Sequence, residues 1–351
     1  MLAEMPGLVL DGQTTGPTPA RGRLLELAWG RLPGVGDDVE ARLLALPAGQ
    51  QLPARIRRLT GIAADDLAAA LPAERVWAAL MSAAAGLGAP PWPLVIHYAR
   101  FEAPFLRALH AACGAGDFPF RLICTHAIAQ RLLPGLPRRG LRAVAGFFGH
   151  HLEAPRRAGD HARATALVWR ELTARLRARR GVETLAALEA WLRREAPKTT
   201  RRKTFRLPRA KRLALPAGPG VYRLLGRDGR VLYAGKAGSL RARVNAHFGS
   251  LAAAGEKNLE LYSQVWDLAA TPCASALEAA LLELEQIRDQ RPAYNAALLP
   301  ADERVWFAAA DLAGLADRPD RHHRLGPLPD PALMGPLGLL GLPAAVAPPA
   351  G

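Results

Sequence analysis

The sequence predicts an α/β fold for the first half of the chain and a smaller α+β domain for the second half. In the first half, apolar strand-like runs such as Gly7–Leu10 and Leu94–Ile96 alternate with helical stretches, as in a sheet covered by helices. In the second half, the short runs Val221–Leu225 and Val231–Tyr233 flank a polar turn. The 351 residues suffice for two domains with hydrophobic cores.

The second half begins with a β-hairpin that carries one tyrosine on each strand. The turn Gly226–Arg230 separates the two apolar runs. Two helical patterns follow, the first from Ser239 and the second over Ser275–Arg288. The polar residues carried by this segment are, in chain order, Tyr222, Tyr233, Lys236, Arg243, Glu283 and Asn295.

Side chains of these types can together make a phosphodiester-cleaving site. Hydrolysis must activate a water and neutralise the charge that grows on the phosphoryl oxygens. Glu283 can anchor one Mg²⁺ or Mn²⁺ that otherwise keeps water ligands, and Arg243 offers a planar fork of donors for the phosphate. Taken singly, each residue has a simpler interpretation: a packed strand tyrosine, a charge on a solvated helix face, or an asparagine in a turn.

The order of these residues resembles the GIY-YIG nuclease domain found in the excision-repair endonuclease UvrC and its relative Cho. The resemblance covers roughly residues 216–300. Gly220-Val221-Tyr222 stands for the first signature and Tyr233-Ala234-Gly235 for the second. Glu278–Glu283 matches the helix that ends in the metal-binding glutamate. The resemblance implies a three-stranded antiparallel sheet flanked by helices.

The same resemblance assigns roles to the polar residues. Tyr233 is the candidate general base, and because an ordinary phenol has a pKa of about 10 it needs help from the metal or a nearby cation. Lys236 is the expected cation. Tyr222 and Asn295 are expected to orient the water and brace the site, and Glu283 is expected to bind the metal.

The first half resembles the proofreading-type 3′–5′ exonucleases of the ribonuclease H-like fold (the DEDDh type), such as the epsilon subunit of the replicative polymerase. A buried-strand pattern leads into Asp11-Gly12-Gln13-Thr14-Thr15-Gly16, and His97–Glu102 follows a later strand. A long helix over Ala158–Arg177 is expected to close the domain. The resemblance covers about residues 1–178.

The chemistry of those exonucleases is altered in this sequence. The family holds two metal ions with four carboxylates and uses a histidine as base. Asp11 keeps the first carboxylate, but Gln13 puts a neutral amide at the second position. Glu102 replaces the third aspartate with a side chain one methylene longer. The sequence therefore predicts a degenerate exonuclease domain.

The closing exonuclease motif departs further from the family. In one register, Arg156 stands where the histidine base belongs and His161 where the last aspartate belongs. Sliding the register by one residue makes Asp160 the ligand but leaves Pro155 as the base, which has no proton-accepting side chain. Other histidines offer a substitute site only as an alternative; they are His97, His126, His150 and His151.

The positive charge is concentrated between the two domains. The chain has a formal charge of +15, and residues 196–215 carry eight basic and no acidic side chains. This segment is expected to contact a DNA backbone without reading its sequence. The alternative is a flexible linker rich in basic residues through coding bias, since the chain has 41 arginines and five lysines. The expected DNA-binding residues are Lys198, Arg201, Arg202, Lys203, Arg206, Arg209, Lys211 and Arg212.

Composition narrows the class of protein. There is no apolar run of 18 residues, so no membrane-spanning helix is expected. Three widely spaced cysteines give no zinc-ligand spacing and no paired disulfide framework, which favours the bacterial cytoplasm. The expected segments are an exonuclease-like domain over 1–178, a helix and basic linker over 179–215, the nuclease domain over 216–300, and a Pro/Gly/Ala/Leu-rich, partly disordered tail over 301–351.

Together these features predict a metal-dependent DNA endonuclease that nicks one strand of damaged or branched DNA in DNA repair. The expected cofactor is Mg²⁺ or Mn²⁺. The expected partners are DNA and damage-recognition or other repair proteins, with no membrane. Two alternatives remain from the sequence: a non-catalytic DNA-binding scaffold, and a 3′–5′ exonuclease that acts through the first domain.

Overall fold

The computed structural model describes most of the chain and forms two compact units, Met1–Asn295 and Ala296–Gly351. The described residues are 1–34, 38–47, 49–114, 116–152, 157–198, 200, 202–249, 251, 254–295, 306–309, 311, 314–316 and 320–328.

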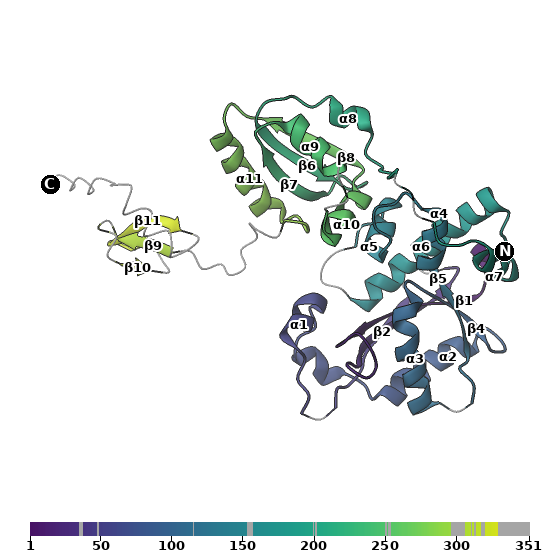
Figure 1. Cartoon of the computed structure of the whole chain (residues 1–351). Helices are drawn as coiled ribbons and strands as arrows, with labels where there is room; N and C mark the ends of the chain where they lie inside the picture. The colour runs from purple at the N-terminus through teal and green to yellow at the C-terminus, as the bar shows by residue number, and fades with distance from the viewer. Residues whose placement is uncertain are drawn as a thin grey trace. The chain divides into compact units, whose positions relative to one another are not determined.

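A five-stranded mixed sheet forms the centre of the first half (Figure 1). In spatial order its strands are β3 (Val39–Leu43), β2 (Leu24–Leu32), β1 (Gly7–Thr14), β4 (Trp92–Ile96) and β5 (Phe120–Cys124). Strands β1, β2 and β3 pair antiparallel, whereas β4 runs parallel to both β1 and β5.

Helices cover both faces of this sheet because successive residues of β1 point to opposite sides. Leu8 and Leu10 belong to one buried cluster together with residues of α2 and α3. Val9, between them, belongs to a second cluster with residues of α4, α5 and α6. The helical elements of this half are η1 (Leu2–Glu4), α1 (Ala54–Thr60), η2 (Asp65–Ala69), α2 (Ala73–Ala85), α3 (Ala99–Cys113), α4 (Thr125–Leu132), α5 (Leu141–Phe147) and α6 (Ala158–Arg180).

The segment between the two halves contains two helices. Helix α7 (Leu185–Arg194) begins at Thr184, whose hydroxyl accepts the Ala187 N–H. Its residues Leu188 and Trp191 are buried in the same cluster as residues of α6, so one face of α7 packs on the first half. Helix α8 (Arg209–Leu213) is a single short turn before the second sheet.

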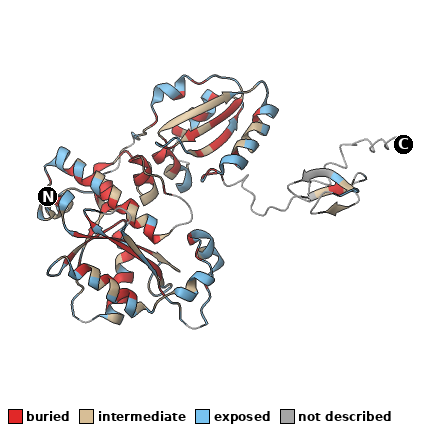
Figure 2. Cartoon of the chain, turned by 180° about the vertical axis from the view of Figure 1, so that it is seen from behind, coloured by how far each residue is buried: buried red, intermediate tan, exposed pale blue. Residues whose placement is uncertain are grey.

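The second sheet has three antiparallel strands in the order β7 (Val231–Ala237), β6 (Gly220–Leu225) and β8 (Asp267–Pro272). Helix α9 (Leu240–Gly249) packs on β6 and β7, as does α11 (Ala276–Gln290). Helix α10 (Glu256–Gln264) lies between β7 and β8 in the chain. Figure 2 shows buried residues along the strands of both sheets. The predicted α/β first half and three-stranded antiparallel second sheet are confirmed.

The two halves meet where α5 packs against α10. The Trp266 indole Nε1–H donates to the Gly146 carbonyl at 2.8 Å. A Cβ on Gly146 would lie 2.2 Å from the Gln264 side chain, so this approach requires glycine. The Arg206 Cζ lies 4.1 Å from the centroid of the Phe147 ring and 4.6 Å from that of the Trp266 ring. We call this set of contacts the junction.

The second unit contains a three-stranded sheet in the order β10 (Leu315–Ala316), β9 (Trp306–Ala309) and β11 (His323–Leu328). This sheet lies within residues 301–351, where the sequence predicts a partly disordered tail, and its strand β11 pairs with β9. Residues 329–351 lie outside the described part of the chain. No helix among the described residues is long and apolar enough to cross a membrane.

A buried carboxylate from the first sheet holds the beginning of α6. Glu26 of β2 is only 1 % exposed. Its Oε2 accepts the Ala158 N–H at 2.8 Å, and its Oε1 accepts Arg157 Nη2 at 2.7 Å. The carboxylate thus pairs a backbone donor that the first turn of a helix leaves free, at the positive end of the helix.

Replacing Glu26 with leucine is expected to lower the free energy of unfolding by about 2 kcal/mol, because several charge-assisted hydrogen bonds are lost. Urea denaturation followed by circular dichroism measures this. Glu40→Gln is the control, since the Glu40–Arg42 pair is exposed and should change stability by less than about 0.5 kcal/mol. Equal effects of the two substitutions would contradict the role of Glu26.

Candidate active site

The β6–β7 hairpin brings the two predicted tyrosines together. Tyr222 pairs with Gly235 across the hairpin, and Tyr233 pairs with Leu224, two pairs further along. The two tyrosine rings are 6.0 Å apart, centroid to centroid. A Cβ on Gly235 would lie 2.8 Å from both the Tyr222 hydroxyl and Tyr233 Cε1. The glycine of the second signature therefore leaves the space in which the two phenols meet.

A histidine that the sequence analysis did not select joins this pair. His247 of α9 accepts or donates at both ring nitrogens: Nε2 is 2.6 Å from the Tyr222 hydroxyl and Nδ1 is 2.7 Å from the Tyr262 hydroxyl. Its ring centroid also lies 6.1 Å from that of Tyr233. We call Tyr222, Tyr233, His247 and Tyr262 the tyrosine–histidine cluster.

Burial sets the protonation states in this cluster. It lowers the pKa of His247 to about 4, with a further contribution from the positive charge of Arg243. His247 is therefore neutral near pH 7. Burial raises the pKa of Tyr222 well above its ordinary value, and the nearby Tyr233 adds to this while Arg243 opposes it. Arg243, four residues before His247 on α9, is thus the cation that acts on the cluster.

Glu283 lies against the end of β7. Its Oε1 accepts the Lys236 backbone N–H at 2.9 Å, and its Oε2 is 3.8 Å from Lys236 Nζ. The Glu283 side chain is 12 % exposed, whereas that of Lys236 is 54 % exposed. The structure therefore places the Lys236 ammonium beside Glu283, and Arg243 beside the tyrosine–histidine cluster.

The surroundings of Glu283 fit a divalent cation. One carboxylate oxygen accepts the β7 backbone N–H, and the other, 3.8 Å from Lys236 Nζ, is the oxygen that would bind an ion in place of this ammonium. One turn further along α11, the Gln286 carboxamide oxygen is buried with no hydrogen-bond partner among the described residues. Carboxylate and carboxamide oxygens suit Mg²⁺, which keeps most of its waters. No group of three metal-ligating side chains occurs in the described part of the chain, so water would complete the coordination.

Asn295 braces the strand that carries Tyr233. Its Oδ1 accepts the Ala234 N–H at 2.9 Å, and its Nδ2 donates to the Ala234 carbonyl at 2.7 Å. The preceding residue, Tyr294, donates its N–H to the Leu232 carbonyl. Asn295 is 7 % exposed. The carboxamide therefore acts on the backbone of β7, which was the bracing half of its expected role.

The exonuclease-like region has its own buried polar cluster at the end of β1. Asp11 is 5 % exposed, and its Oδ2 accepts the Gln13 amide at 2.8 Å. The His161 Nδ1 is 3.5 Å from the same oxygen. Asp160, by contrast, is exposed and pairs with Arg163 on α6. The phase of α6 therefore favours the register in which His161 occupies the last aspartate position.

Glu102 lies in the first turn of α3 and is 6 % exposed. Burial raises its pKa well above the ordinary value, and the nearby Asp11 raises it further. Its charged form is therefore disfavoured. His97 is also buried, with both nitrogens bonded, to the Thr125 hydroxyl and the Arg139 carbonyl. Arg156, the residue at the base position, lies outside the described residues.

The basic segment is divided between structural and exposed roles. Arg212 is buried and stacks 4.6 Å from the Phe248 ring. Lys211 pairs with Asp267 at 2.7 Å, and Arg206 belongs to the junction. Lys203 donates to the Thr200 carbonyl. The exposed basic side chains among the described residues of this segment are Lys198, Arg202, Arg209 and Lys211, and Lys198 pairs with Glu195. Arg201 lies outside the described residues.

Comparison with known families agrees with the geometry of the second sheet. The model of the UvrC-like GIY-YIG domain matches residues 218–296. This segment is a UvrC-like GIY-YIG domain. It contains β6, β7, β8, the tyrosine–histidine cluster, Glu283 and Asn295.

The curated relatives cover the chain unequally. A Mycobacterium tuberculosis protein, provisionally named a bifunctional exonuclease/endonuclease, is 34 % identical over 204 residues, 58 % of this chain and 30 % of that protein. Since only 134 residues of this chain lie from 218 onward, that match extends into the first half, which is exonuclease-like. The UvrABC system protein C of Legionella pneumophila is 44 % identical over 84 residues, 24 % of this chain and 13 % of that protein. The chain therefore spans less than a third of either relative.

Solved structures resemble each half. The N-terminal GIY-YIG endonuclease domain of UvrC from Thermotoga maritima, bound to magnesium as its catalytic divalent cation, is 31 % identical, with a TM-score of 0.23. The match covers 25 % of this chain and 94 % of that domain. An exonuclease X in complex with 5′-overhanging duplex DNA is 18 % identical with a TM-score of 0.36, covering 48 % of this chain and 90 % of that one.

The His247 ring is expected to titrate with a midpoint near pH 4, below the ordinary 6.5, because burial disfavours its charged form. Between these values the unfolded chain binds more protons at this residue, so its contribution to stability is lost as pH falls from about 6.5 to about 4. NMR titration of the histidine rings measures the midpoint, and His247→Gln assigns the signal. A midpoint near 6.5 in the folded protein, equal to that in urea, would disprove burial of the ring.

Proposed function

We propose that this chain is a metal-dependent DNA endonuclease that nicks one strand through its GIY-YIG domain. One observation carries the proposal. Strand β7 carries Tyr233 of the tyrosine–histidine cluster and, three residues later, the Lys236 N–H that binds the Glu283 carboxylate of α11. Phosphodiester hydrolysis needs a base for the water, a positive charge for the phosphate and a ligand for a divalent cation. Tyr233, Arg243 and Glu283 would supply these in turn.

In the proposed reaction the phenolate form of Tyr233 takes a proton from the attacking water and becomes the neutral phenol. The water oxygen forms the new bond to phosphorus while the bond to the leaving oxygen breaks, and the leaving oxygen is protonated from solvent. Arg243 has two effects: its charge opposes the rise that burial causes in the pKa of Tyr222 and Tyr262, and its fork of donors suits the phosphoryl oxygens. His247, being neutral, holds the Tyr222 hydroxyl without adding a second positive charge.

A bound divalent cation would neutralise charge on the phosphoryl and leaving oxygens. Glu283 would hold it, with the orphaned Gln286 oxygen next along the helix available to bind a metal-bound water. Magnesium is the ion named for the Thermotoga maritima domain, and Mn²⁺ has the same preference for oxygen ligands. The Lys236 ammonium would move away from Glu283 when the ion binds, and its exposed position permits that movement.

We propose that the exonuclease-like half does not cleave DNA. Its Asp11 carboxylate accepts a hydrogen bond from Gln13 and lies beside His161, where the family would place two more carboxylates. Burial also disfavours the charged form of Glu102. With a neutral amide and an imidazole at two of the four carboxylate positions of the family, the cluster lacks the negative charge that holds a pair of divalent cations.

The substrate and cellular setting follow from the relatives. The UvrABC system protein C relatives and the magnesium-bound UvrC domain favour a role in DNA repair, on damaged or branched DNA. Because contacts to phosphates carry no sequence information, selection of the site would come from DNA structure or from repair proteins that load the chain. The bacterial cytoplasm is the proposed location.

End-labelled duplexes, one intact, one lesion-bearing and one branched, test the proposal in Mg²⁺ and in Mn²⁺. Wild type is expected to give discrete internal nicks. Tyr233→Phe and Glu283→Gln are each expected to slow nicking at least about 100-fold, the scale of a lost general base or metal ligand. Asp11→Asn is expected to leave the rate unchanged.

The products separate the alternatives. A ladder that shortens from the 3′ end and disappears only in Asp11→Asn would assign the activity to the exonuclease-like half. Binding that depends on salt, with no cleavage of any substrate by wild type and no effect of Glu283→Gln, would identify a scaffold. Either outcome would overturn the proposal.

A further inference from the structure

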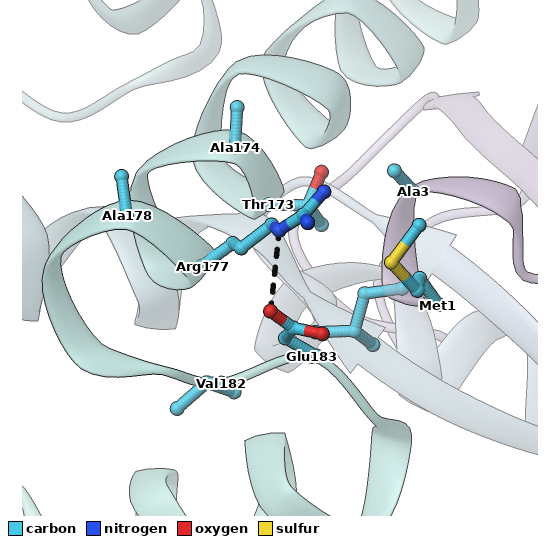
Figure 3. Close-up of a pocket in the computed structure, with 9 residues that line it drawn as sticks. Met1, Ala3, Thr173, Ala174, Arg177, Ala178, Val182 and Glu183 are labelled. Carbon is cyan, nitrogen blue, oxygen red and sulfur yellow. Dashed lines mark ion pairs between the residues drawn. The ribbon is translucent and has the colours of Figure 1, made fainter.

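The structure contains several hollows, and most offer no chemistry for a ligand. The hollow beside the N-terminal turn, with a volume of about 300 Å³, is lined by Met1, Ala3 and residues of α6 (Figure 3). Its one ion pair, Arg177 with Glu183 at 3.2 Å, is already satisfied within the hollow. The remaining lining is largely apolar, so this hollow gives no basis for selecting a ligand.

A second hollow, of about 620 Å³, is strongly basic. Five parts of the chain line it: the end of α4, the following residues 133–136, Phe147 at the end of α5, the last turns of α6, and described residues of the segment 198–206. We call it the basic hollow. Its cationic side chains are Arg131, Arg175, Arg179, Arg180, Lys198, Arg202 and Arg206.

Carboxylates neutralise only part of this charge. Arg175 pairs with Glu171 at 2.7 Å, and Lys198 pairs with Glu195 at 2.7 Å. Among the described residues that line the basic hollow there is no aspartate or glutamate. The pKa of Arg206 is lowered by burial and, next, by the charge of Arg175, so like charges are held close together. An anion in the hollow would offset that repulsion, and a concave surface of one sign focuses the field.

The basic hollow is built by fixed contacts. The Thr204 N–H donates to the Gly135 carbonyl at 2.9 Å, and a Cβ on Gly135 would lie 2.4 Å from the Thr204 hydroxyl. Arg131 donates to the carbonyls of Ala127 and Leu192. The segment around Thr204 and the side chain of Arg131 are therefore positioned before any ligand arrives, which lowers the entropy cost of binding.

A simpler explanation accounts for only some of the arginines. Cations in the last turn of a helix are favoured by the helix dipole, and Arg179 and Arg180 occupy the last turn of α6. Arg131 likewise lies in the last turn of α4. Lys198 and Arg202 belong to no helix, so the dipole does not explain why they line the same hollow.

We propose that the basic hollow binds successive phosphates of the DNA strand that the GIY-YIG domain cleaves; this rests on the proposed function. Guanidinium groups match phosphate oxygens with paired donors. The lining holds no asparagine or glutamine that would read a base edge. The hollow thus anchors DNA through the DNA backbone. Most of the binding residues belong to the exonuclease-like half but lie outside the polar cluster around Asp11.

The test measures DNA binding without cleavage. Glu283→Gln protein in EDTA is titrated against a fluorescent 20-nucleotide strand at several salt concentrations. The triple variant Arg179→Gln, Arg180→Gln and Arg202→Gln is added to that background. Affinity is expected to fall at least about 10-fold near 0.1 M salt. The slope of log K against log salt is expected to drop by about 2, at roughly 0.7 per phosphate contact of a single strand.

A matched control removes the same charge elsewhere. Arg55, Arg57 and Arg58 are exposed on α1, and their triple replacement by glutamine is expected to change affinity by less than about 3-fold, through long-range charge alone. All six substitutions are at exposed positions, and thermal unfolding by circular dichroism confirms the fold of each variant.

The outcomes are distinct from those of the nicking assay. Equal losses in the two triple variants would overturn the basic hollow as a DNA site, whether or not wild type nicks DNA. The proposal would also be overturned if the triple variant of the hollow weakened the binding of ATP or inorganic pyrophosphate but not of DNA. That result would assign the hollow to a small polyphosphate. A loss specific to the hollow variant, in a protein that fails to nick, would support the anchor and disprove only the proposed cleavage.

Discussion

The arrangement of the first unit depends on a guanidinium held between two aromatic rings. Arg206 stacks on Phe147 from the exonuclease-like half and on Trp266 from the GIY-YIG domain, and its Nε donates to the Phe147 carbonyl at 3.0 Å. A charge in this position is stable because the rings face it and the carbonyl accepts its hydrogen bond. The linker therefore joins the two halves through a defined contact at Arg206. This contact also positions the linker residues before and after Arg206.

The features readable from the sequence were those with local patterns. The hairpin, the helices carrying Arg243 and Glu283, and the docked helix α7 all follow from periodicity and turn residues within a few positions. His247 could not be recognised in this way, because a histidine on a short helix gains meaning only when Tyr262, fifteen residues on, bonds its ring. Likewise a count of charge treated the basic segment as uniform, whereas stacking on Phe248 withdraws Arg212 from the surface.

The exonuclease-like half separates a fold from its chemistry. The alternation of Leu8, Val9 and Leu10 between two apolar clusters needs only hydrophobic side chains of suitable size, so it tolerates loss of the polar residues at the end of the strand. The phase of α6 gives His161 the place next to Asp11 and leaves Asp160 in solvent. Sequence registers alone left this choice open, since it depends on how the helix packs on β1 and β2.

Asn295 has a consequence for the state of association of this protein. Strand β7 is at the edge of its sheet, and an edge strand exposes unpaired N–H and C=O groups to which another chain can add. The Asn295 carboxamide takes both groups of Ala234, and the Tyr294 N–H takes the Leu232 carbonyl. The end of the first unit thus substitutes for a fourth strand and blocks edge-to-edge pairing between copies, beside the residues that would meet DNA.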